Sequence, residues 1–192
     1  EANPIDLFRK WFAVAEKSEI NDPNALSVAT SNKDGIPSVR MVLLKGLSEK
    51  GFVFYTNFNS KKGKDLKENP QASMCFHWKS LRRQVRISGK AVQIEDKEAD
   101  QYYNSRAYES RIGAWASSQS QVMKNRNEFL DKIKAYEKKY PNQKEVPRPS
   151  HWSGWRVEPN IIEFWLEIKN RIHERLNYKK NNGKWIREIL YP

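Results

Sequence analysis

The stretch from residue 25 to residue 57, ALSVATSNKDGIPSVRMVLLKGLSEKGFVFYTN, decides the fold class. Three runs in it are rich in β-branched, apolar and aromatic residues: Leu26–Ser31, Ser38–Lys45 and Phe52–Thr56. Such runs predict β-strands when residues that favour turns separate them. The two separators, Asn32–Gly35 and Ser48–Gly51, are of that kind, because Gly, Asn, Asp and Ser favour tight turns. The stretch therefore predicts consecutive antiparallel hairpins.

The segments on either side extend this pattern and add helices. Before it, Asn3 and Pro4 favour a helix start, and the apolar stripe that follows predicts one helix that ends before Asp22-Pro23-Asn24. After it, we expect a short helix over Ser60–Asn69 and a helical insertion from Glu95 to about Tyr140. Five further strands are expected: Ala72–Lys79, Gln84–Ile94, Ile161–Leu166, Arg171–Tyr178 and Lys184–Leu190. The whole chain therefore predicts a single domain, mainly β with peripheral helices, in which about six to eight antiparallel strands form a small barrel.

Length and composition favour a folded protein with a sizeable core. The 192 residues are 38% hydrophobic and 12% aromatic and include seven Trp, which argues against intrinsic disorder. No apolar run approaches the roughly 20 residues that span a bilayer, so we expect no membrane association. Cys75 is the only cysteine and cannot form an internal disulfide, so we expect a reducing, cytoplasmic location. Because the chain begins with Glu1 and not with Met, we also expect a trimmed or processed start that a short leader precedes.

The charge balance indicates an anionic partner. The chain has 35 Lys and Arg against 23 Asp and Glu, a formal net charge of +12. Two interpretations compete: a surface for nucleic-acid backbones, or a pocket for small phosphorylated ligands. Composition alone leaves both open. Aromatic and basic residues do not interleave as a single-strand stacking platform requires, and so we expect no nucleic-acid partner.

The segment Ser60-Lys61-Lys62-Gly63-Lys64 places several cations in the first turn of a predicted helix. Cations there oppose the positive end of the helix dipole by roughly a few tenths of a kcal/mol each. A bound phosphate would reverse that sign, because free backbone N–H groups and lysines would converge on it. The alternative is a solvated lysine cluster that salt screens, and this fragment alone leaves both open.

Arg171, His173 and Arg175 form a second cluster of potential cations. On a strand, alternate side chains share a face, so these three are expected to point together, each about 7 Å from the next. They repel one another unless an anion or an electron-rich ligand lies between them. The alternative is the exposed polar face of an edge strand. By the same alternation Arg40 and Lys45, which flank an apolar strand, are expected on opposite faces.

No motif indicates a metal site or a nucleotide-binding loop. His77, His151 and His173 have no metal-ligand spacing with one another or with Cys75, so we expect no metal. The chain contains no Gly-rich phosphate loop, no GxSxG elbow and no Rossmann fingerprint. Cys75 and most of the tryptophans are expected in the core.

Five sets of residues occur in an order that is specific to one family. They are Ser38–Gly46, Phe54–Asn57, Arg83–Arg86, Ile112–Trp115, and Glu163–Trp165 followed by Arg171–Arg175. Together they resemble the pyridoxamine (pyridoxine) 5′-phosphate oxidase family of flavoenzymes, and the resemblance covers nearly the whole chain. It implies an FMN-binding split β-barrel that works as a homodimer, with the flavin at the subunit interface.

The resemblance also implies the residues of the site. Those implied to bind FMN are Arg40, Met41, Val42, Leu43, Leu44, Lys45, Tyr55, Thr56, Lys61, Lys62, Gln84, Gln119, Ser120, Trp165 and Arg175. Those implied to bind the substrate are Lys45, Tyr102, Arg106, Ser110, Arg171, Ile172 and His173. The implied reaction oxidises pyridoxamine or pyridoxine 5′-phosphate to pyridoxal 5′-phosphate, with O2 as acceptor and H2O2 as product. In it, Arg171 holds the substrate ring over the flavin, and His173 orients the substrate or assists proton movement.

Two other functions stay open at this point. A related split-barrel oxidase, such as the flavin oxidases of phenazine biosynthesis, would share the flavin residues and act on another ring. Tyr102, Arg106 and Ser110 favour a phosphorylated substrate, because they offer converging hydrogen-bond donors. The other alternative is a non-enzymatic module that binds flavin or nucleic acid, and its affinity for nucleic acid would fall steeply with salt.

Overall fold

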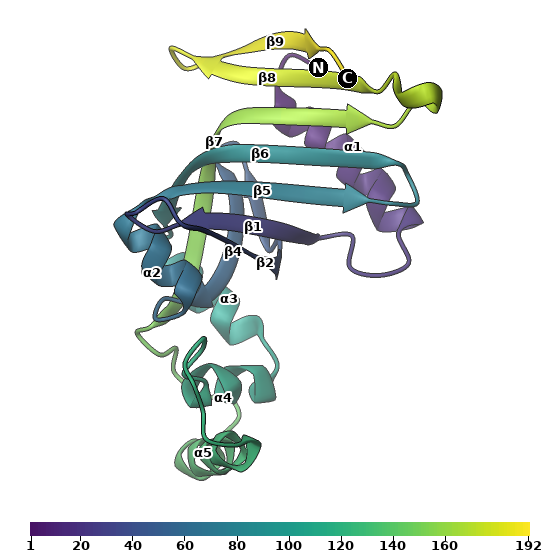
Figure 1. Ribbon diagram of the computed structural model, residues 1–192. Helices are drawn as coiled ribbons and strands as arrows, with labels where there is room; N and C mark the ends of the chain where they lie inside the picture. The colour runs from purple at the N-terminus through teal and green to yellow at the C-terminus, as the bar shows by residue number, and fades with distance from the viewer.

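The computed structural model describes residues 1–192, and its centre is one curled sheet of nine strands (Figure 1). The strands are β1 (Ala25–Ser31), β2 (Pro37–Leu43), β3 (Gly46–Ser48), β4 (Gly51–Asn57), β5 (Gln71–Trp78), β6 (Arg83–Gln93), β7 (Trp152–Leu166), β8 (Glu174–Asn181) and β9 (Lys184–Leu190). The helices are α1 (Pro4–Ser18), α2 (Lys61–Glu68), α3 (Asp96–Ser105), α4 (Tyr108–Ala116), α5 (Arg126–Lys139) and a short 3₁₀ helix, η1 (Lys169–Arg171). The predicted fold class, mainly antiparallel β with peripheral helices, is confirmed.

Strand β7 joins the two halves of the sheet. One edge of β7 pairs with β6, while the other edge pairs with β4 through Trp152–Val157 and with β8 through Ile161–Leu166. The strand order is β2-β1-β5-β6-β7-β4-β3, and β8 and β9 extend from the second half of β7. Strand β2 then lies against β4 with no hydrogen-bonded ladder between them, so the barrel is open along this seam.

A bulge allows the paired strands β6 and β7 to bend. The register shifts between Ser88 and Gly89, opposite Pro159. A Cβ atom on Gly89 would lie 2.0 Å from the carbonyl oxygen of Glu158, so the close approach of the two backbones requires glycine here. Proline has no N–H to donate to a ladder, and a bulge is one of the few positions in a sheet that accept it. Because of the bend, the first half of β7 reaches β4 and the second half reaches β8.

Helix α1 covers the inner face of the sheet and completes the core. Its start matches the prediction, since the side chain of Asn3 accepts a hydrogen bond from the backbone N–H of Ile5. The buried ring of Phe8 meets the ring of Phe52 edge-on, with centroids 4.9 Å apart. Such aromatic pairs contribute roughly 1 kcal/mol beyond the burial of their area. The helix therefore covers the inner face of the barrel, while α3 packs through Ala99 on Val53 at the other face of β4.

Residues 96–139 form the three helices that extend away from the sheet. In Figure 1, α3 lies below the barrel, and α4 and α5 lie further out. Helix α5 packs against α4 and buries none of its own residues. None of the helices has the length and apolar character that crossing a bilayer requires.

Two strands begin far from their predicted starts, and the short strand β3 was not predicted, so the sheet has nine strands and not the expected six to eight. Strand β7 begins at Trp152 and not at Ile161, because its first half is buried on both faces and so lacks the alternation that marks a strand. Strand β8 begins at Glu174, so the predicted strand from Arg171 is wrong at its start. Asn170 and Arg171 have φ angles of 60° and 62°, and this left-handed backbone is incompatible with a strand. We also expected Arg171, His173 and Arg175 to point from one face of a single strand, and this prediction is therefore wrong as well.

Candidate active site

A cavity of about 370 Å³ lies where β2, β4, α2, α3, α4 and the start of β7 meet. Ten residues of the predicted site line it: Met41, Val42, Leu43, Lys45, Tyr55, Thr56, Lys62, Tyr102, Arg106 and Gln119. Five lining residues are not among those predicted: Asn57, Gly113, Ala114, Ser117 and Trp152. The cavity therefore depends on contacts between segments that are far apart in the sequence.

Cations line this cavity and carboxylates do not. Lys45, Lys62 and Arg106 are among its lining residues, which include no Asp or Glu. The ammonium group of Lys62 donates hydrogen bonds to Thr56 Oγ1 at 3.1 Å and to Gln119 Oε1 at 3.5 Å. Lys62 is only 8% exposed, and this burial lowers its pKa to about 8. Buried positive charge without a carboxylate partner favours an anionic ligand.

Anion affinity is expected to fall as the pH rises through the pKa of Lys62. Below about pH 8 the side chain is protonated and attracts an anion, whereas the neutral amine does not. Sulfate keeps its charge over this range, so its binding to the ligand-free protein, measured by calorimetry, should weaken about tenfold between about pH 7 and pH 9. Lys62→Arg should bind sulfate equally at both pH values. A wild-type affinity that does not change between them would contradict this assignment.

Arg106 has unused hydrogen-bonding capacity. Its Nη1 atom is buried and has no hydrogen-bond partner. The guanidinium group lies over the ring of Trp152, 4.6 Å from the ring centroid. Burial lowers the pKa of Arg106 from its usual value, but an arginine stays charged in any case. An unpaired buried donor costs about 1–3 kcal/mol, so a ligand that accepts a hydrogen bond from Nη1 would recover that free energy.

Three aromatic rings stack on one another beside these cations. Tyr55 stacks on Tyr102 with centroids 3.9 Å apart, and on Trp152 with centroids 5.2 Å apart. Burial raises the pKa of Tyr55 to about 12, so its hydroxyl stays protonated near neutral pH. Aromatic residues that line a cavity next to fixed cations suit a planar ring that carries an anionic group.

Two of the predicted cofactor residues, Arg40 and Lys61, contact Asp65 and do not line the cavity. Asp65 is 2% exposed and accepts hydrogen bonds of 2.7 Å from both Lys61 Nζ and Thr30 Oγ1. Burial alone would raise the pKa of Asp65, but the hydrogen bonds from Lys61, Thr30 and Ser38 together lower it. Arg40 also donates to the side chains of Thr30 and Ser38. Asp65 therefore joins β1, β2 and the start of α2 behind the cavity wall.

Three predicted cofactor residues form a row on the outer face of the sheet. Gln84, Trp165 and Arg175 lie opposite one another on β6, β7 and β8, so their side chains share one face; we call them the outer row. Arg175 donates hydrogen bonds of 2.9 and 3.1 Å to Glu163, which is 3% exposed. Next to the row, the ring of His173 packs on Trp165 with centroids 4.6 Å apart.

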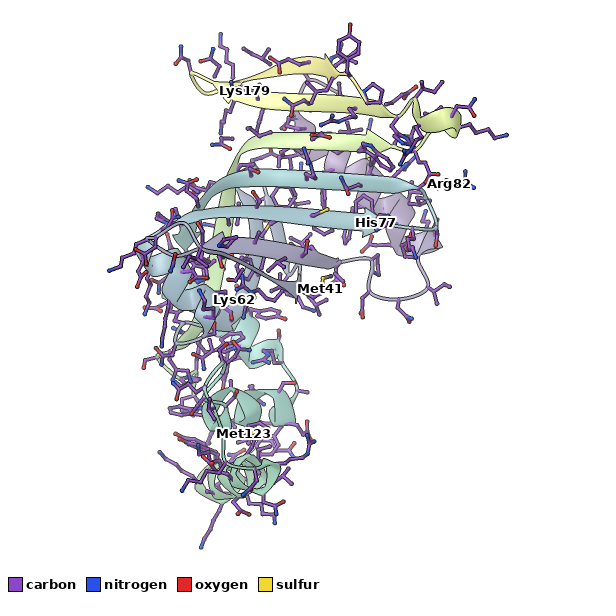
Figure 2. All side chains as sticks on the ribbon, in the orientation of Figure 1. Met41, Lys62, His77, Arg82, Met123 and Lys179 are labelled. Carbon is purple, nitrogen blue, oxygen red and sulfur yellow. The ribbon has the colours of Figure 1, made fainter.

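The outer row and the cavity are far apart within one copy of the chain. Trp165 on β7 lies four strands from Met41 on β2, about 19 Å along the sheet at roughly 4.8 Å per strand. In Figure 2, Lys62 in the cavity and Arg82, just before the row, lie well apart. None of the three residues of the row lines the cavity. One copy of the chain therefore does not bring the two groups of predicted residues together.

The remaining predicted residues lie outside the cavity. Leu44 is 6% exposed and packs in the core. Ser110, Ser120 and Ile172 are exposed, and Arg171 is exposed in η1. Among the lining residues that the sequence did not predict, Trp152 contacts the predicted residues Tyr55, Tyr102 and Arg106. The sequence placed it in the core. No local pattern distinguishes a tryptophan that lines a cavity from one that fills a core.

The fold, with a basic cavity beside its open seam, is that of the split β-barrel proteins. The structure superposes with a TM-score of 0.94 on PhzG from Burkholderia lata, solved in complex with tetrahydrophenazine-1-carboxylic acid; the two are 31% identical, and the match covers 100% of this chain and 94% of that one. It also matches a pyridoxamine 5′-phosphate oxidase-related, FMN binding protein from Nostoc punctiforme, with a TM-score of 0.77, 18% identity and coverage of 96% and 97%, a likeness that concerns the fold alone.

The sequence identifies the family within this class. Residues 14–140 match the family described as pyridoxamine 5′-phosphate oxidase, and residues 152–192 match the pyridoxine 5′-phosphate oxidase C-terminal dimerisation region. A pyridoxine/pyridoxamine 5′-phosphate oxidase of Pelagibacter ubique is 60% identical over 191 residues, which cover 99% of this chain and 92% of that protein. The chain therefore belongs to the pyridoxamine 5′-phosphate oxidase family, and the predicted family is confirmed.

Proposed function

We propose that this protein oxidises pyridoxamine 5′-phosphate and pyridoxine 5′-phosphate to pyridoxal 5′-phosphate, with FMN as cofactor and O2 as the final acceptor. The observation that carries the proposal is the cavity, which combines three cations, no carboxylate, and the buried, unpartnered Nη1 of Arg106 beside stacked aromatic rings. Both FMN and the substrate are planar rings that carry a phosphate, and these groups suit them. Membership of the family supports the same reaction.

The residues of the cavity fit FMN. Lys62 lies in the first turn of α2, where its charge and the positive end of the helix would both attract the flavin phosphate. Arg40 and Lys61 would add positive charge from behind the wall. The lining residues of β2 together with Tyr55 and Thr56 would hold the flavin itself. When bound, FMN supplies the two-electron acceptor that O2 reoxidises with release of H2O2.

The other two cations of the cavity suit the substrate phosphate. Arg106 would bind it through its planar fork of N–H groups, and Lys45 would act as a point charge. Tyr102, stacked on Tyr55, would contact the substrate. Ser110 lies outside the cavity lining, and only the family resemblance assigns it to the substrate. The phosphate would thus be fixed at a distance from the carbon that is oxidised.

We infer that the protein works as a homodimer with the flavin at the interface. The match of residues 152–192 to the dimerisation region of the family supports this. So does the outer face of β2, where the apolar residues Val39 and Met41 are 67% and 65% exposed. Exposed apolar residues on a sheet edge are typical of an interface. A second copy docked on this face would bring its outer row to the cavity.

Arg171 and His173 of the second copy would act on the substrate. His173 Nδ1 accepts a hydrogen bond from the backbone N–H of Ile168, so the neutral ring carries its proton on Nε2. That N–H would donate to the substrate and orient it, or move a proton at the substituent on C4′. Arg171 would hold the pyridine ring in the orientation that the reaction requires.

The cofactor and the products test this proposal. The purified protein is expected to be yellow and to release FMN, not FAD, when it is denatured. Under air and with pyridoxine 5′-phosphate, it is expected to form H2O2 and aldehyde in equal amounts. Protein that carries FMN but leaves both phosphorylated substrates unchanged would overturn the proposed reaction.

An oxidase of the phenazine type is the second candidate. The likeness to PhzG favours it, because that protein was solved with tetrahydrophenazine-1-carboxylic acid. A ring that bears a carboxylate would also suit a basic cavity. Parallel assays with pyridoxine 5′-phosphate and a reduced phenazine carboxylate separate the two candidates, and we expect turnover of the first only. Flavin binding without turnover of either would favour a flavin carrier.

A further inference from the structure

We propose that Trp152 is a positioning residue, whose ring holds the guanidinium group of Arg106 by stacking and leaves its N–H groups free for the substrate phosphate. This inference rests on the proposed function, which assigns that phosphate to Arg106. Trp152 is the first residue of β7 and lines the cavity. It is 7% exposed, so the packing around it fixes the position of its ring.

Arg106 differs from other partly buried arginines of the chain in what holds it. Three of these are held by carboxylates at 2.6 to 2.9 Å: Arg148 by Asp96 and Asp100, Arg156 by Glu98, and Arg175 by Glu163. Arg106 forms no ion pair and instead lies 4.6 Å from the centroid of the Trp152 ring. Arg106 is therefore held by a ring where these three arginines are held by carboxylates, and among the arginines only Arg83, which lies over Trp11 outside the cavity, has a similar stack.

Stacking and ion pairing use different parts of a guanidinium group. All five N–H donors lie in the plane of the group, so a carboxylate binds at its edge, where a phosphate would also bind. An aromatic ring binds the flat face and leaves the edge free. The buried and unpartnered Nη1 of Arg106 is a donor that stays available in this way. A carboxylate in place of Trp152 would compete with the ligand, and the ring does not.

The ring of Trp152 is itself held on several sides. Tyr55 stacks on it with an interplanar angle of 11°, and the fully buried Tyr103 meets it edge-on at 5.2 Å. The backbone is fixed too, since Arg148 donates a hydrogen bond of 2.9 Å to the carbonyl oxygen of Trp152. A rigid ring can restrict a long side chain before the ligand arrives, and this lowers the entropy that binding must overcome.

Binding of a non-reactive ligand tests this role without relying on turnover. 4-Deoxypyridoxine 5′-phosphate has neither an oxidisable group on C4′ nor an aldehyde, and calorimetry measures its Kd for the flavin-loaded protein. Trp152→Leu is expected to raise this Kd about tenfold, and Trp152→Phe, which keeps an aromatic face, about threefold. Binding of 4-deoxypyridoxine, which lacks the phosphate, should not change. The KM for pyridoxine 5′-phosphate should rise in parallel, while kcat changes less than about twofold.

Trp11→Leu is the matched control, because Arg83 lies over Trp11 with its guanidinium carbon 4.5 Å from the ring centroid, and neither residue lines the cavity. This variant removes a stack of nearly the same geometry and should leave the Kd unchanged. A loss of affinity in Trp11→Leu as large as in Trp152→Leu would overturn the proposal. It would mean that these substitutions act through the stability of the fold and not through the position of Arg106.

A double-mutant cycle shows whether Trp152 acts through Arg106. In the Arg106→Ala background, Trp152→Leu should change the Kd less than about twofold. Equal tenfold losses in both backgrounds would overturn the proposal, because Trp152 would then act independently of Arg106. If Arg106→Ala alone left the Kd unchanged, the assignment of the phosphate to Arg106, and with it the proposed substrate site, would fail instead.

Discussion

Replacing Arg106 with alanine is expected to raise the KM for pyridoxine 5′-phosphate about 100-fold or more, with a much smaller change in kcat. Loss of one partner from a buried, hydrogen-bonded charge pair costs about 2–5 kcal/mol, and each 1.4 kcal/mol is a factor of about ten. The phosphate is remote from C4′, so its contact with Arg106 is equally strong in the ground state and the transition state. Loss of this contact therefore raises KM and changes kcat little. Initial rates of H2O2 formation across a range of substrate concentrations measure it.

Arg106→Lys separates charge from geometry at the same position. Lysine keeps the positive charge but has no planar fork and stacks less well on Trp152, so it should recover only part of the lost affinity. Arg126→Ala, at the exposed start of α5, is the matched arginine control and should leave both constants unchanged. A KM for Arg106→Ala within about threefold of wild type would contradict the assigned contact.

Replacing His173 with alanine is expected to lower kcat by about 100- to 1,000-fold, at the lower end of the usual contribution of a positioned acid or base. In the wild type the hydrogen bond from the Ile168 N–H to Nδ1 places the proton of the neutral ring on Nε2. Alanine has no such proton to donate to the substrate. Rapid mixing of substrate with the oxidised protein follows flavin bleaching and isolates this step from reoxidation by O2.

Arg171→Ala is expected to lower kcat/KM as well, because the ring would lose its orientation. Lys179→Ala, at the far end of β8 and labelled in Figure 2, is a control that should behave as wild type. Unchanged kcat/KM in both His173→Ala and Arg171→Ala would show that neither residue acts on the substrate.

Much of the fold could be predicted because several strands have one more buried and one more exposed face. Strand β1 alternates along its whole length, and so does β5 over most of its length, as a half-buried strand must. The first half of β7 has no such signal, since both its faces are buried. The turn at Asn170 and Arg171 could not be predicted either. A left-handed backbone at two successive residues that are not glycine depends on the surrounding structure and not on local propensity.

The site could be predicted only in part, for two physical reasons. Charge and spacing indicated an anion site near Lys62, but they did not show that Asp65 draws Arg40 and Lys61 to its own side. A buried carboxylate finds its partners through tertiary contacts that no local pattern reveals. The place of Trp152 in the cavity could not be predicted from the sequence either, because it depends on the packing of α3 against the start of β7. The resemblance to a family supplied most of the lining residues, and the arrangement of cations came from the structure.

Each active site is proposed to combine the cavity of one copy with the outer row and His173 of another. Co-refolding equal amounts of Arg106→Ala and His173→Ala protein tests this most directly. The readout is oxidation of pyridoxine 5′-phosphate at a concentration near the wild-type KM, where Arg106→Ala protein alone is nearly inactive because of its raised KM. Half of the dimers would then be mixed, and each mixed dimer would hold one intact site, so about one quarter of wild-type activity should return. Activity no higher than that of the two variants refolded separately would contradict a shared site.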